Sequence, residues 1–306
     1  MTDNSGVERR DAIDAFAVGL MVALTFTWGF NQVAIKVANS GYNPLFVSVL
    51  RAVIGAVLMF AWCRYRRIPL LVRDGTFWPG VLVGCIFAVQ FAMIFMAMDY
   101  TTAARGALTL NAMPFWVLIG AHFLLDEKIT LPKFCGLMLA FAGVALVFAD
   151  ELSLPNPDAL LGDLMSLTAG IMWAATIIVV KRTALSDAPP EKTLVYQLAI
   201  SAVVVLPFVP LAGPLVRDGN ALATWSVVFQ ALVVVGITYP AWYWLIWRYP
   251  APSLSSFTFL TPVFGVLCGG VLLNEPLSMN IFMALALIAA GLFLVNRPMR
   301  RRLPPG

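Results

Sequence analysis

The chain has 306 residues, of which 60% are hydrophobic and only 12% are charged. A soluble domain carries about 25% charged residues, and a fold of this size could not keep so much apolar surface away from water. The composition therefore excludes a soluble globular protein and predicts an all-α protein that crosses a membrane many times.

Ten apolar segments follow one another along the chain, each close to the ~20 residues that a helix needs to cross a bilayer core. Continuous runs of this length exclude a transmembrane β-barrel, whose strands are shorter and alternate in polarity. The connections are short and leave no room for an attached soluble domain. The predicted spans are residues 14–37, 44–63, 77–98, 103–125, 131–149, 160–181, 192–212, 224–247, 252–273 and 279–296.

The basic residues predict the orientation of these spans. The polar N-terminus "MTDNSGVERRDAID" precedes an apolar run without a cleavage pattern, which we interpret as an uncleaved first helix. Sixteen of the twenty Lys and Arg residues fall on the same side as this N-terminus, and only Lys36, Arg105 and Arg217 fall on the other. The positive-inside rule then predicts that both termini are cytoplasmic. The net charge of +4 follows from this asymmetry and requires no nucleic-acid partner.

The two halves of the chain repeat one another. Five helices per half is an odd number, so the second copy must enter the membrane from the opposite side. The predicted organisation is a cytoplasmic segment at 1–13, a first five-helix repeat at 14–149, a periplasmic linker at 150–159, a second, inverted five-helix repeat at 160–296 and a basic cytoplasmic tail at 297–306. The matching pairs are Trp28/Trp173, Lys36/Lys181 and Pro44/Pro189 at an offset of 145, and Pro114/Pro262, Glu127/Glu275 and Gly143/Gly291 at an offset of 148.

An inverted repeat favours alternating access. If the two copies exchange conformations, the end of the molecule that is closed changes, and the binding site lies near the midplane between them. The alternative is a gene duplication without mechanistic meaning.

Three prolines are expected to kink their helices and to act in gating. Pro114 and Pro262 leave the carbonyls of Leu110 and Thr258 without a helical partner, and Pro240 predicts a further kink. In lipid such groups must be satisfied by neighbouring protein or by cavity water. Glu127 and Glu275 end their helices and are interpreted as helix-end or gate contacts.

The positions of the charged and titratable residues limit the classes of substrate that the protein could transport. All sixteen acids are predicted in loops or at span ends, which disfavours a cation–proton antiporter with a buried carboxylate. Arg51 lies within a span, either as a carboxylate clamp or as an arginine that is bonded to backbone carbonyls or extended toward the interface. The one histidine, His122, falls near a helix end. The four cysteines act as small hydrophobic residues, and no metal or other cofactor is predicted.

The remaining polar and aromatic residues at membrane depth form the predicted substrate cavity. The aromatic rings would stack on an apolar or aromatic side chain, while the polar groups bond the amino and carboxylate groups. Trp242, Trp244 and Trp247 are instead interpreted as interfacial anchors or packing residues. The predicted cavity residues are Trp28, Gln32, Gln90, Asn111, Trp173, Thr176, Thr238, Tyr239, Tyr243, Ser255 and Thr258.

The duplicated pattern resembles the drug/metabolite transporter superfamily, specifically its ten-helix EamA-type members. The resemblance rests on a Trp in the first span of each half, a Pro near the start of the second, a mid-span Pro in the fourth, and the closing "DEKIT" or "NEPLS". It covers about residues 15–297, and within the family the chain is similar to the YddG-type exporters of aromatic amino acids. It implies a bacterial inner-membrane exporter whose cavity is lined by the first, third, fourth, sixth, eighth and ninth spans.

The predicted function is thus alternating-access export of amino acids and related small metabolites across a lipid bilayer. The alternative within the family is a multidrug or nucleoside- and nucleobase-type exporter. A membrane-embedded enzyme is disfavoured because no metal cluster, G-x-S-x-G or P-loop is present in the sequence. A channel is the third possibility, although nothing in the sequence resembles a filter. The oligomeric state is not predicted, and a monomer is compatible with this architecture.

Overall fold

A computed structural model describes residues 10, 12–70, 72–101, 103–147, 149, 158–273 and 280–296. Eight helices in this part of the chain are long and apolar enough to cross a membrane, and shorter apolar helices cover Leu131–Leu146 and Phe282–Asn296. The described regular elements are helices, and only an isolated bridge joins Tyr42 to Val216. The ten predicted spans are therefore confirmed. Glu275, the linker residues 150–157, the tail 297–306 and most of the segment 1–13 lie outside the described residues.

The spans of the first half correspond to α1 to α6, with the fourth span divided in two. Pro44 stands in the first turn of α2, where its missing N–H leaves no bond unmade. The side chain of Asn43 caps the same turn by accepting a hydrogen bond of 3.0 Å from the N–H of Phe46. The helices are α1 (Ala15–Gly41), α2 (Pro44–Tyr65), α3 (Phe77–Tyr100), α4 (Ala103–Leu110), α5 (Met113–Leu124) and α6 (Leu131–Val147).

The second half repeats this order with more irregular helices. The seventh span joins α8 to a 3-10 segment, the eighth contains a π-helical segment between α9 and α10, and the ninth contains a 3-10 turn between α11 and α12. The elements are α7 (Ala159–Arg182), η2 (Ala184–Ser186), α8 (Pro190–Val205), η3 (Leu206–Ala212), α9 (Ala221–Phe229), η4 (Gln230–Thr238), α10 (Tyr239–Arg248), α11 (Ala251–Ser256), η5 (Phe257–Phe259), α12 (Leu260–Leu273) and α13 (Asn280–Asn296).

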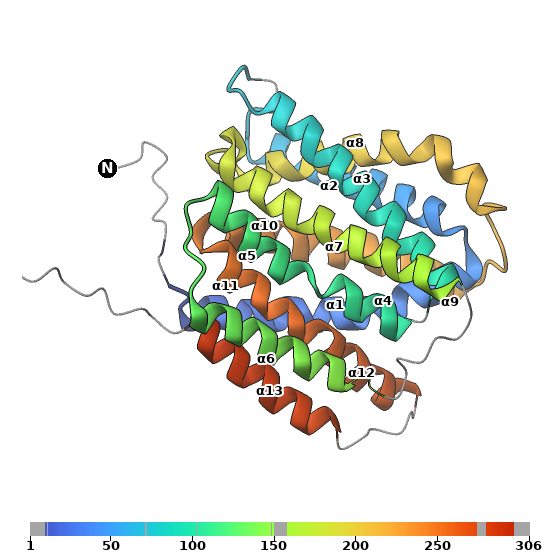
Figure 1. The fold of residues 1–306 in the computed structure, drawn as a ribbon. Helices are drawn as coiled ribbons and strands as arrows, with labels where there is room; N and C mark the ends of the chain where they lie inside the picture. Colours follow the sequence, from blue (N-terminus) through green and yellow to red (C-terminus); the bar gives the residue numbers. More distant parts are fainter. Residues whose placement is uncertain are drawn as a thin grey trace, which may run out of the picture.

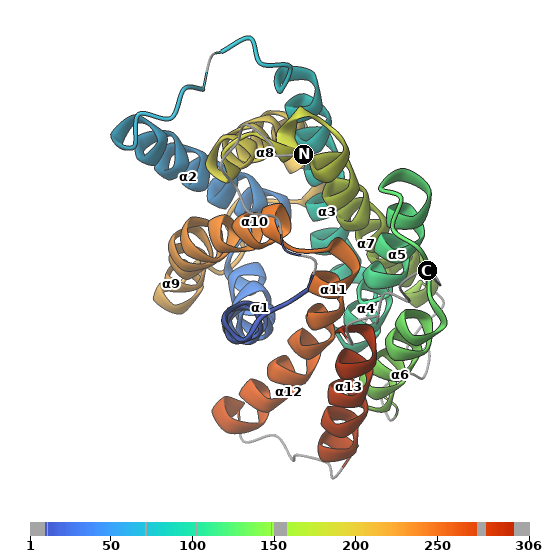
Figure 2. The same ribbon diagram turned by 90° about the vertical axis from the view of Figure 1, so that its left-hand side faces the viewer.

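The helices run side by side and alternate in direction, so that α1 begins and α13 ends at the same end of the bundle (Figure 1). Seen end-on, α6 and α13 lie together at one edge of the bundle and α2 and α8 at the other (Figure 2). Large apolar side chains such as Val57, Phe60, Val203 and Phe293 are exposed on the outer faces of the helices. Such surfaces are stable against lipid tails and unfavourable in water.

The contacts between α6 and α13 identify the repeat as inverted. A Cβ atom on Gly136 would lie 2.7 Å from the carbonyl oxygen of Gly291, and one on Gly143 would lie 2.8 Å from that of Ala284. Gly136 is the repeat equivalent of Ala284, and Gly143 that of Gly291, so the two contacts exchange under the offset of 148. Because the paired helices run antiparallel, the axis that relates the halves lies across them, in the plane of the membrane.

The other helix pairs obey the same symmetry. Helix α1 packs against α9 and α12, and its equivalent α7 packs against α3 and against α4 and α5. Each half therefore binds its first helix to the third and fourth spans of the other half. The core of the molecule is consequently an interface between the repeats.

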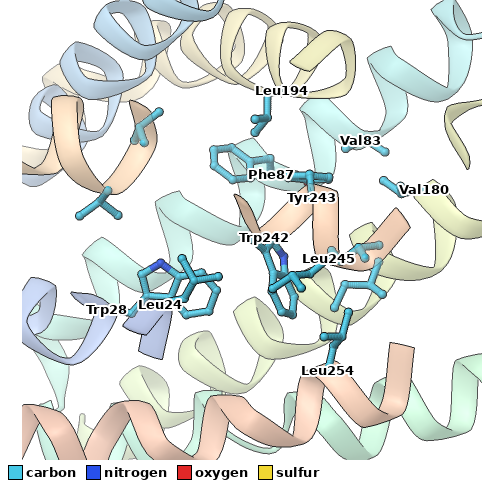
Figure 3. Packing of buried hydrophobic residues seen from close by; sticks show 14 of the residues in the cluster. Leu24, Trp28, Val83, Phe87, Val180, Leu194, Trp242, Tyr243, Leu245 and Leu254 are labelled. Atoms are coloured by element: carbon cyan, nitrogen blue, oxygen red, sulfur yellow. The ribbon is translucent and has the colours of Figure 1, made fainter. Parts of the chain in front are cut away.

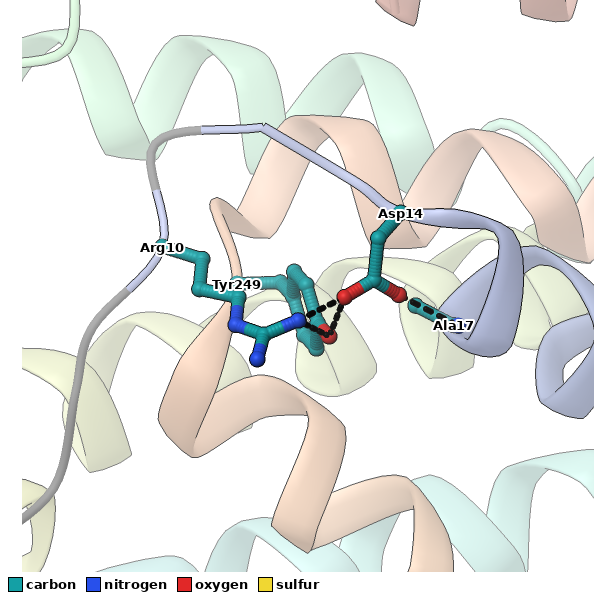
Figure 4. A network of polar contacts seen from close by, with 4 residues as sticks. All are labelled: Arg10, Asp14, Ala17 and Tyr249. Carbon is teal, nitrogen blue, oxygen red and sulfur yellow. Dashed lines mark hydrogen bonds and ion pairs between the residues drawn. The ribbon is translucent and has the colours of Figure 1, made fainter.

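A network of polar contacts around Tyr249 lies at one end of the bundle (Figure 4). The Tyr249 hydroxyl donates to Asp14 Oδ2 at 2.9 Å, and Asp14 also pairs with Arg10 and caps α1 through the N–H of Ala17 at 2.8 Å. The backbone carbonyl of Tyr249 accepts a 2.6 Å hydrogen bond from Lys181 Nζ. This network joins the start of α1 to the ends of α7 and α10.

A second polar contact fixes the loop between α2 and α3. Lys192 Nζ, whose side chain is 1% exposed, lies 2.6 Å from Asp74 Oδ2 in that loop. Burial tends to raise the pKa of Asp74, but hydrogen bonds from Lys192 and Thr76 outweigh it and lower the pKa from 3.8 to about 2. The pair therefore stabilises the fold above pH ~4, and this contribution is lost as the pH falls toward 2.

The Lys192 side chain is more buried than that of Asp74, so we expect substitutions of the two residues to destabilise the fold by different amounts. Asp74→Asn leaves the buried Lys192 ammonium without its carboxylate and should cost about 1–3 kcal/mol. Lys192→Met leaves a partly solvated carboxylate and should cost less, and the double variant should match Lys192→Met. Thermal unfolding in detergent measures all three, and equal losses for the two single variants would contradict this account.

Candidate functional site

A cavity of about 100 Å³ lies between the two repeats, near the middle of the helices that surround it. One water molecule needs about 10–15 Å³ by the same measure, so the space holds several waters or part of a small solute. Its walls come from α1, α3, the α4–α5 junction, α7, α8, η4, α10, η5 and α12. The lining residues are Trp28, Asn31, Gln32, Ile35, Phe87, Gln90, Phe91, Ile94, Leu110, Asn111, Trp173, Thr176, Gln197, Val234, Tyr239, Trp242, Tyr243, Thr258 and Thr261.

Three tryptophans form one wall of the cavity. The ring centroids of Trp28 and Trp173, which are repeat equivalents, lie 5.9 Å apart, and Trp242 lies 5.4 Å from the first and 6.4 Å from the second. All three pairs are edge-to-face, the geometry that aromatic quadrupoles favour. Figure 3 shows Trp28 and Trp242 side by side, with Phe87 and Tyr243 on the neighbouring wall. The wall offers ring edges and faces to an apolar or aromatic group.

Trp28 is fixed in this wall by a hydrogen bond. Its Nε1–H donates to Thr238 Oγ1 at 2.9 Å, and Thr238 donates in turn to the carbonyl of Val234 at 2.6 Å. Thr238 itself does not line the cavity. Its role in the structure is therefore to orient Trp28.

Four buried polar atoms on the cavity wall lack a hydrogen-bond partner among the described residues. They are Asn31 Oδ1, Gln90 Oε1, Thr176 Oγ1 and Thr261 Oγ1. A buried polar group without a partner costs about 1–3 kcal/mol, so such groups are normally satisfied by water or a ligand. Their gathering on one cavity indicates a site that holds water or a polar ligand.

The break between α4 and α5 brings Asn111 to the cavity. The Asn111 side chain donates to the carbonyl of Ala107 at 2.7 Å, while Pro114 leaves the carbonyl of Leu110 without a partner in its own helix. Helix α7 approaches closely here, since a Cβ atom on Gly170 would lie 2.9 Å from the Leu110 oxygen. The helix is interrupted between Leu110 and Met113, just before Pro114.

The helix also changes form beside Pro240 and Pro262. Before Pro240 lies the π-helical segment η4, whose last turn bonds the N–H of Tyr239 to the carbonyl of Val234, five residues back. Before Pro262 lies the 3-10 turn η5. Val234 and Thr258, which belong to these two segments, line the cavity.

Two tyrosines on α10 line the cavity in different environments. Tyr243 donates its hydroxyl proton to Gln197 Oε1 at 2.7 Å. Tyr239 accepts a hydrogen bond of 3.0 Å from Arg51 Nη2. Arg51 is 2% exposed, so it does not extend to the interface, and its hydrogen bonds to the described residues go to side chains, those of Tyr239 and Gln230. The guanidinium contacts the face of Phe91 at 4.2 Å from the ring centroid.

Most of the predicted cavity residues are brought together. Trp28, Gln32, Gln90, Asn111, Trp173, Thr176, Tyr239, Tyr243 and Thr258 line the cavity, whereas Thr238 and Ser255 do not. The Ser255 hydroxyl instead donates to the carbonyl of Pro252 at 3.1 Å. The 3-10 turn after Ser255 changes the angle between successive side chains, so Thr261 faces the cavity in its place.

Sequence reasoning missed several other lining residues. Trp242, interpreted as an anchor or packing residue, belongs to the aromatic wall, and Asn31 and Gln197 were not selected. The repeat itself carried a signal, because Asn31 is the equivalent of Thr176 at the offset of 145. His122 lies at the end of α5, where its Nδ1 is 3.3 Å from the carbonyl of Glu127, and is absent from the cavity lining.

The EamA-like transporter family matches the chain over residues 15–149 and again over 160–297. The chain belongs to the EamA-like transporter family.

Several curated relatives of this EamA-like transporter match over nearly its whole length. It is 28% identical to the "Probable amino-acid metabolite efflux pump" of Escherichia coli strain K12, over 90% of this chain and 93% of that protein. It is 26% identical to the "Uncharacterized transporter YoaV" of Bacillus subtilis strain 168, over 92% and 97%. A solved crystal structure shares the fold with a TM-score of 0.79 at 19% identity, over 92% of this chain and 98% of the other.

The close approach of α7 to the α4–α5 break gives a test of the cavity wall. Gly170→Ala places a methyl group 2.9 Å from the Leu110 carbonyl oxygen and 3.6 Å from its Cα, so backbone must move. Overpacking of this kind costs about 1–3 kcal/mol. The matched control is Gly19→Ala on α1, where nothing lies within 4 Å. Thermal unfolding should show a loss for Gly170→Ala alone, and equal behaviour of the two would contradict the described contact.

Proposed function

We propose that this EamA-like transporter exports amino acids, chiefly aromatic and other neutral ones, and related small metabolites by alternating access. The observation that carries the proposal is the chemistry of the cavity, in which an aromatic wall faces neutral polar groups that lack partners. Its described lining contains no Asp, Glu, Lys, Arg or His. A site of this kind suits a solute whose charges cancel.

The unpartnered groups suit the two ends of an amino acid. The amide oxygens of Asn31 and Gln90 are acceptors for an ammonium group, and the hydroxyls of Thr176 and Thr261 can donate or accept. The tryptophan wall would hold an apolar or aromatic side chain. The name of the Escherichia coli relative is consistent with this substrate class.

Alternating access follows from the inverted repeat. The halves meet at the cavity, and the helix breaks beside Pro114, Pro240 and Pro262 lie at or next to its wall. A break is a place where one part of a helix can turn relative to the other without breaking regular hydrogen bonds. Exchange of the two conformations between the repeats would close one end of the cavity and open the other.

We further propose that the transporter lies in a bacterial inner membrane with both termini in the cytoplasm. The excess of Lys and Arg at the end of the bundle that holds Arg10, Lys181 and Lys192 supports this orientation. The linker 150–159 then lies in the periplasm, and the residues around Tyr249 close the cytoplasmic end. The relatives are transporters and efflux pumps, which supports a role other than catalysis.

Transport by purified protein in proteoliposomes tests the proposal. Vesicles loaded with a mixture of amino acids and adenosine should release aromatic and neutral amino acids selectively, with and without a pH gradient. Trp173→Ala removes one side of the aromatic wall and should lower the flux by about tenfold or more. Trp225→Ala, on α9 and 69% exposed, is the matched control and should leave the flux unchanged.

Flux of adenosine or of drug-like cations without amino-acid flux would replace the proposal by the alternative of a nucleoside or multidrug exporter. The aromatic wall would stack on a nucleobase as well as on an aromatic side chain, so the comparison of adenosine with amino acids separates the two substrate classes. Equal fluxes for Trp173→Ala and the wild type would contradict the assignment of the cavity as the substrate site.

A further inference from the structure

Arg51 is a buried cation without a counter-charge. Its side chain is 2% exposed, and among the described residues it forms no ion pair. Its contacts are Tyr239 Oη at 3.0 Å, Gln230 Oε1 at 3.5 Å and the ring of Phe91. Burial of an unpaired charge within a membrane protein is costly, and stability alone would favour an apolar residue at this position.

Tyr239 connects this charge to the cavity. A guanidinium has only donors, so the Tyr239 oxygen accepts the bond from Arg51 and its own proton is free to point elsewhere. Among the described residues no hydrogen bond donated by that proton is found. Tyr239 lines the cavity, as does Phe91, whose ring face contacts the guanidinium. A residue of the cavity wall therefore carries an O–H donor whose oxygen is bonded to a full positive charge.

Hydrogen bonds that are chained in this way strengthen one another. Donation from Arg51 draws electron density from the phenol oxygen and makes its proton a better donor. In surroundings of low polarity the charge behind the hydroxyl also favours an anion in front of it. By contrast, the unpartnered atoms of Asn31 and Gln90 are acceptors, so the cavity holds groups suited to opposite charges.

We propose that the Tyr239 hydroxyl, which is polarised by its hydrogen bond from Arg51, recognises the carboxylate of the substrate. Arg51 acts as a positioning and polarising residue, and does not itself line the cavity. Phe91 in the first repeat is the equivalent of Tyr239 in the second, at the offset of 148. The two halves therefore differ at this point. The site can therefore bind a zwitterion in one orientation. This inference rests on the proposed function, because it names the feature by which that cavity selects its solute.

A comparison of phenylalanine with phenylalanine amide isolates the carboxylate. The two probes have nearly the same size and ring, and only the first carries the negative group. Binding to the purified full-length protein should favour phenylalanine, and Tyr239→Phe should lower that preference by about tenfold, the value of a hydrogen bond to a charged group. Arg51→Gln should lower it in the same direction.

Tyr243→Phe is the matched control. It removes a hydroxyl from the same helix and the same cavity, but that hydroxyl already donates to Gln197 and does not contact Arg51. The ratio of the two affinities should stay at the wild-type value in this variant, whatever happens to each affinity. An unchanged ratio in Tyr239→Phe would overturn the inference, as would an equal fall in Tyr243→Phe.

The outcomes separate this inference from the proposed function. If phenylalanine binds and is transported, but the ratio is the same in the wild type and Tyr239→Phe, the exporter assignment stands and the role of Tyr239 is wrong. If neither probe binds to folded protein, the proposed substrate class fails first. Because Tyr239→Phe keeps the ring and its packing, it remains decisive even if Arg51→Gln does not fold.

Discussion

A backbone amide or carbonyl inside a lipid bilayer must find its partner within the protein, and the rest of this structure depends on that constraint. It makes every span a helix, and it allows a helix to break only beside protein or water. The breaks between α4 and α5, in η4 and in η5 all reach the same cavity, through Asn111, Val234 and Thr258. The irregular backbone and the site are thus two consequences of one requirement.

The inverted repeat provides a symmetric frame, and the residues on it make the site asymmetric. Ten of the nineteen lining residues form five pairs of equivalent positions, and the members of a pair differ in chemistry except where Trp28 meets Trp173 near the axis. A symmetric frame suits a molecule that must open at either end with similar ease. An asymmetric lining suits a solute with one ammonium, one carboxylate and one side chain. The pairs are Trp28/Trp173, Asn31/Thr176, Phe91/Tyr239, Ile94/Trp242 and Leu110/Thr258.

The sequence was sufficient for the fold and for much of the cavity. Apolar length predicted ten spans, the spacing of matched residues predicted inversion, and Pro114 predicted the break that presents Asn111. The failures have a common origin in helix geometry. Thr238 was expected on the cavity as a polar residue at membrane depth and Ser255 as part of a polar helix face, but the first lies in a π-helical segment and the second lies just before a 3-10 turn. The partners of Arg51 come from α3 and the η4–α10 region, and no local pattern on α2 could predict them.

The central claim is that one cavity is reached alternately from the two sides of the membrane. Val234 tests it directly, because this small apolar residue lines the cavity halfway along its span. Val234→Cys would be introduced after replacement of Cys63, Cys85, Cys135 and Cys268, and a membrane-impermeant thiol reagent would be applied from either side in separate experiments. The account predicts slow labelling from both sides and protection from both by a transported amino acid. Labelling from one side only, or labelling that no solute changes, would contradict it.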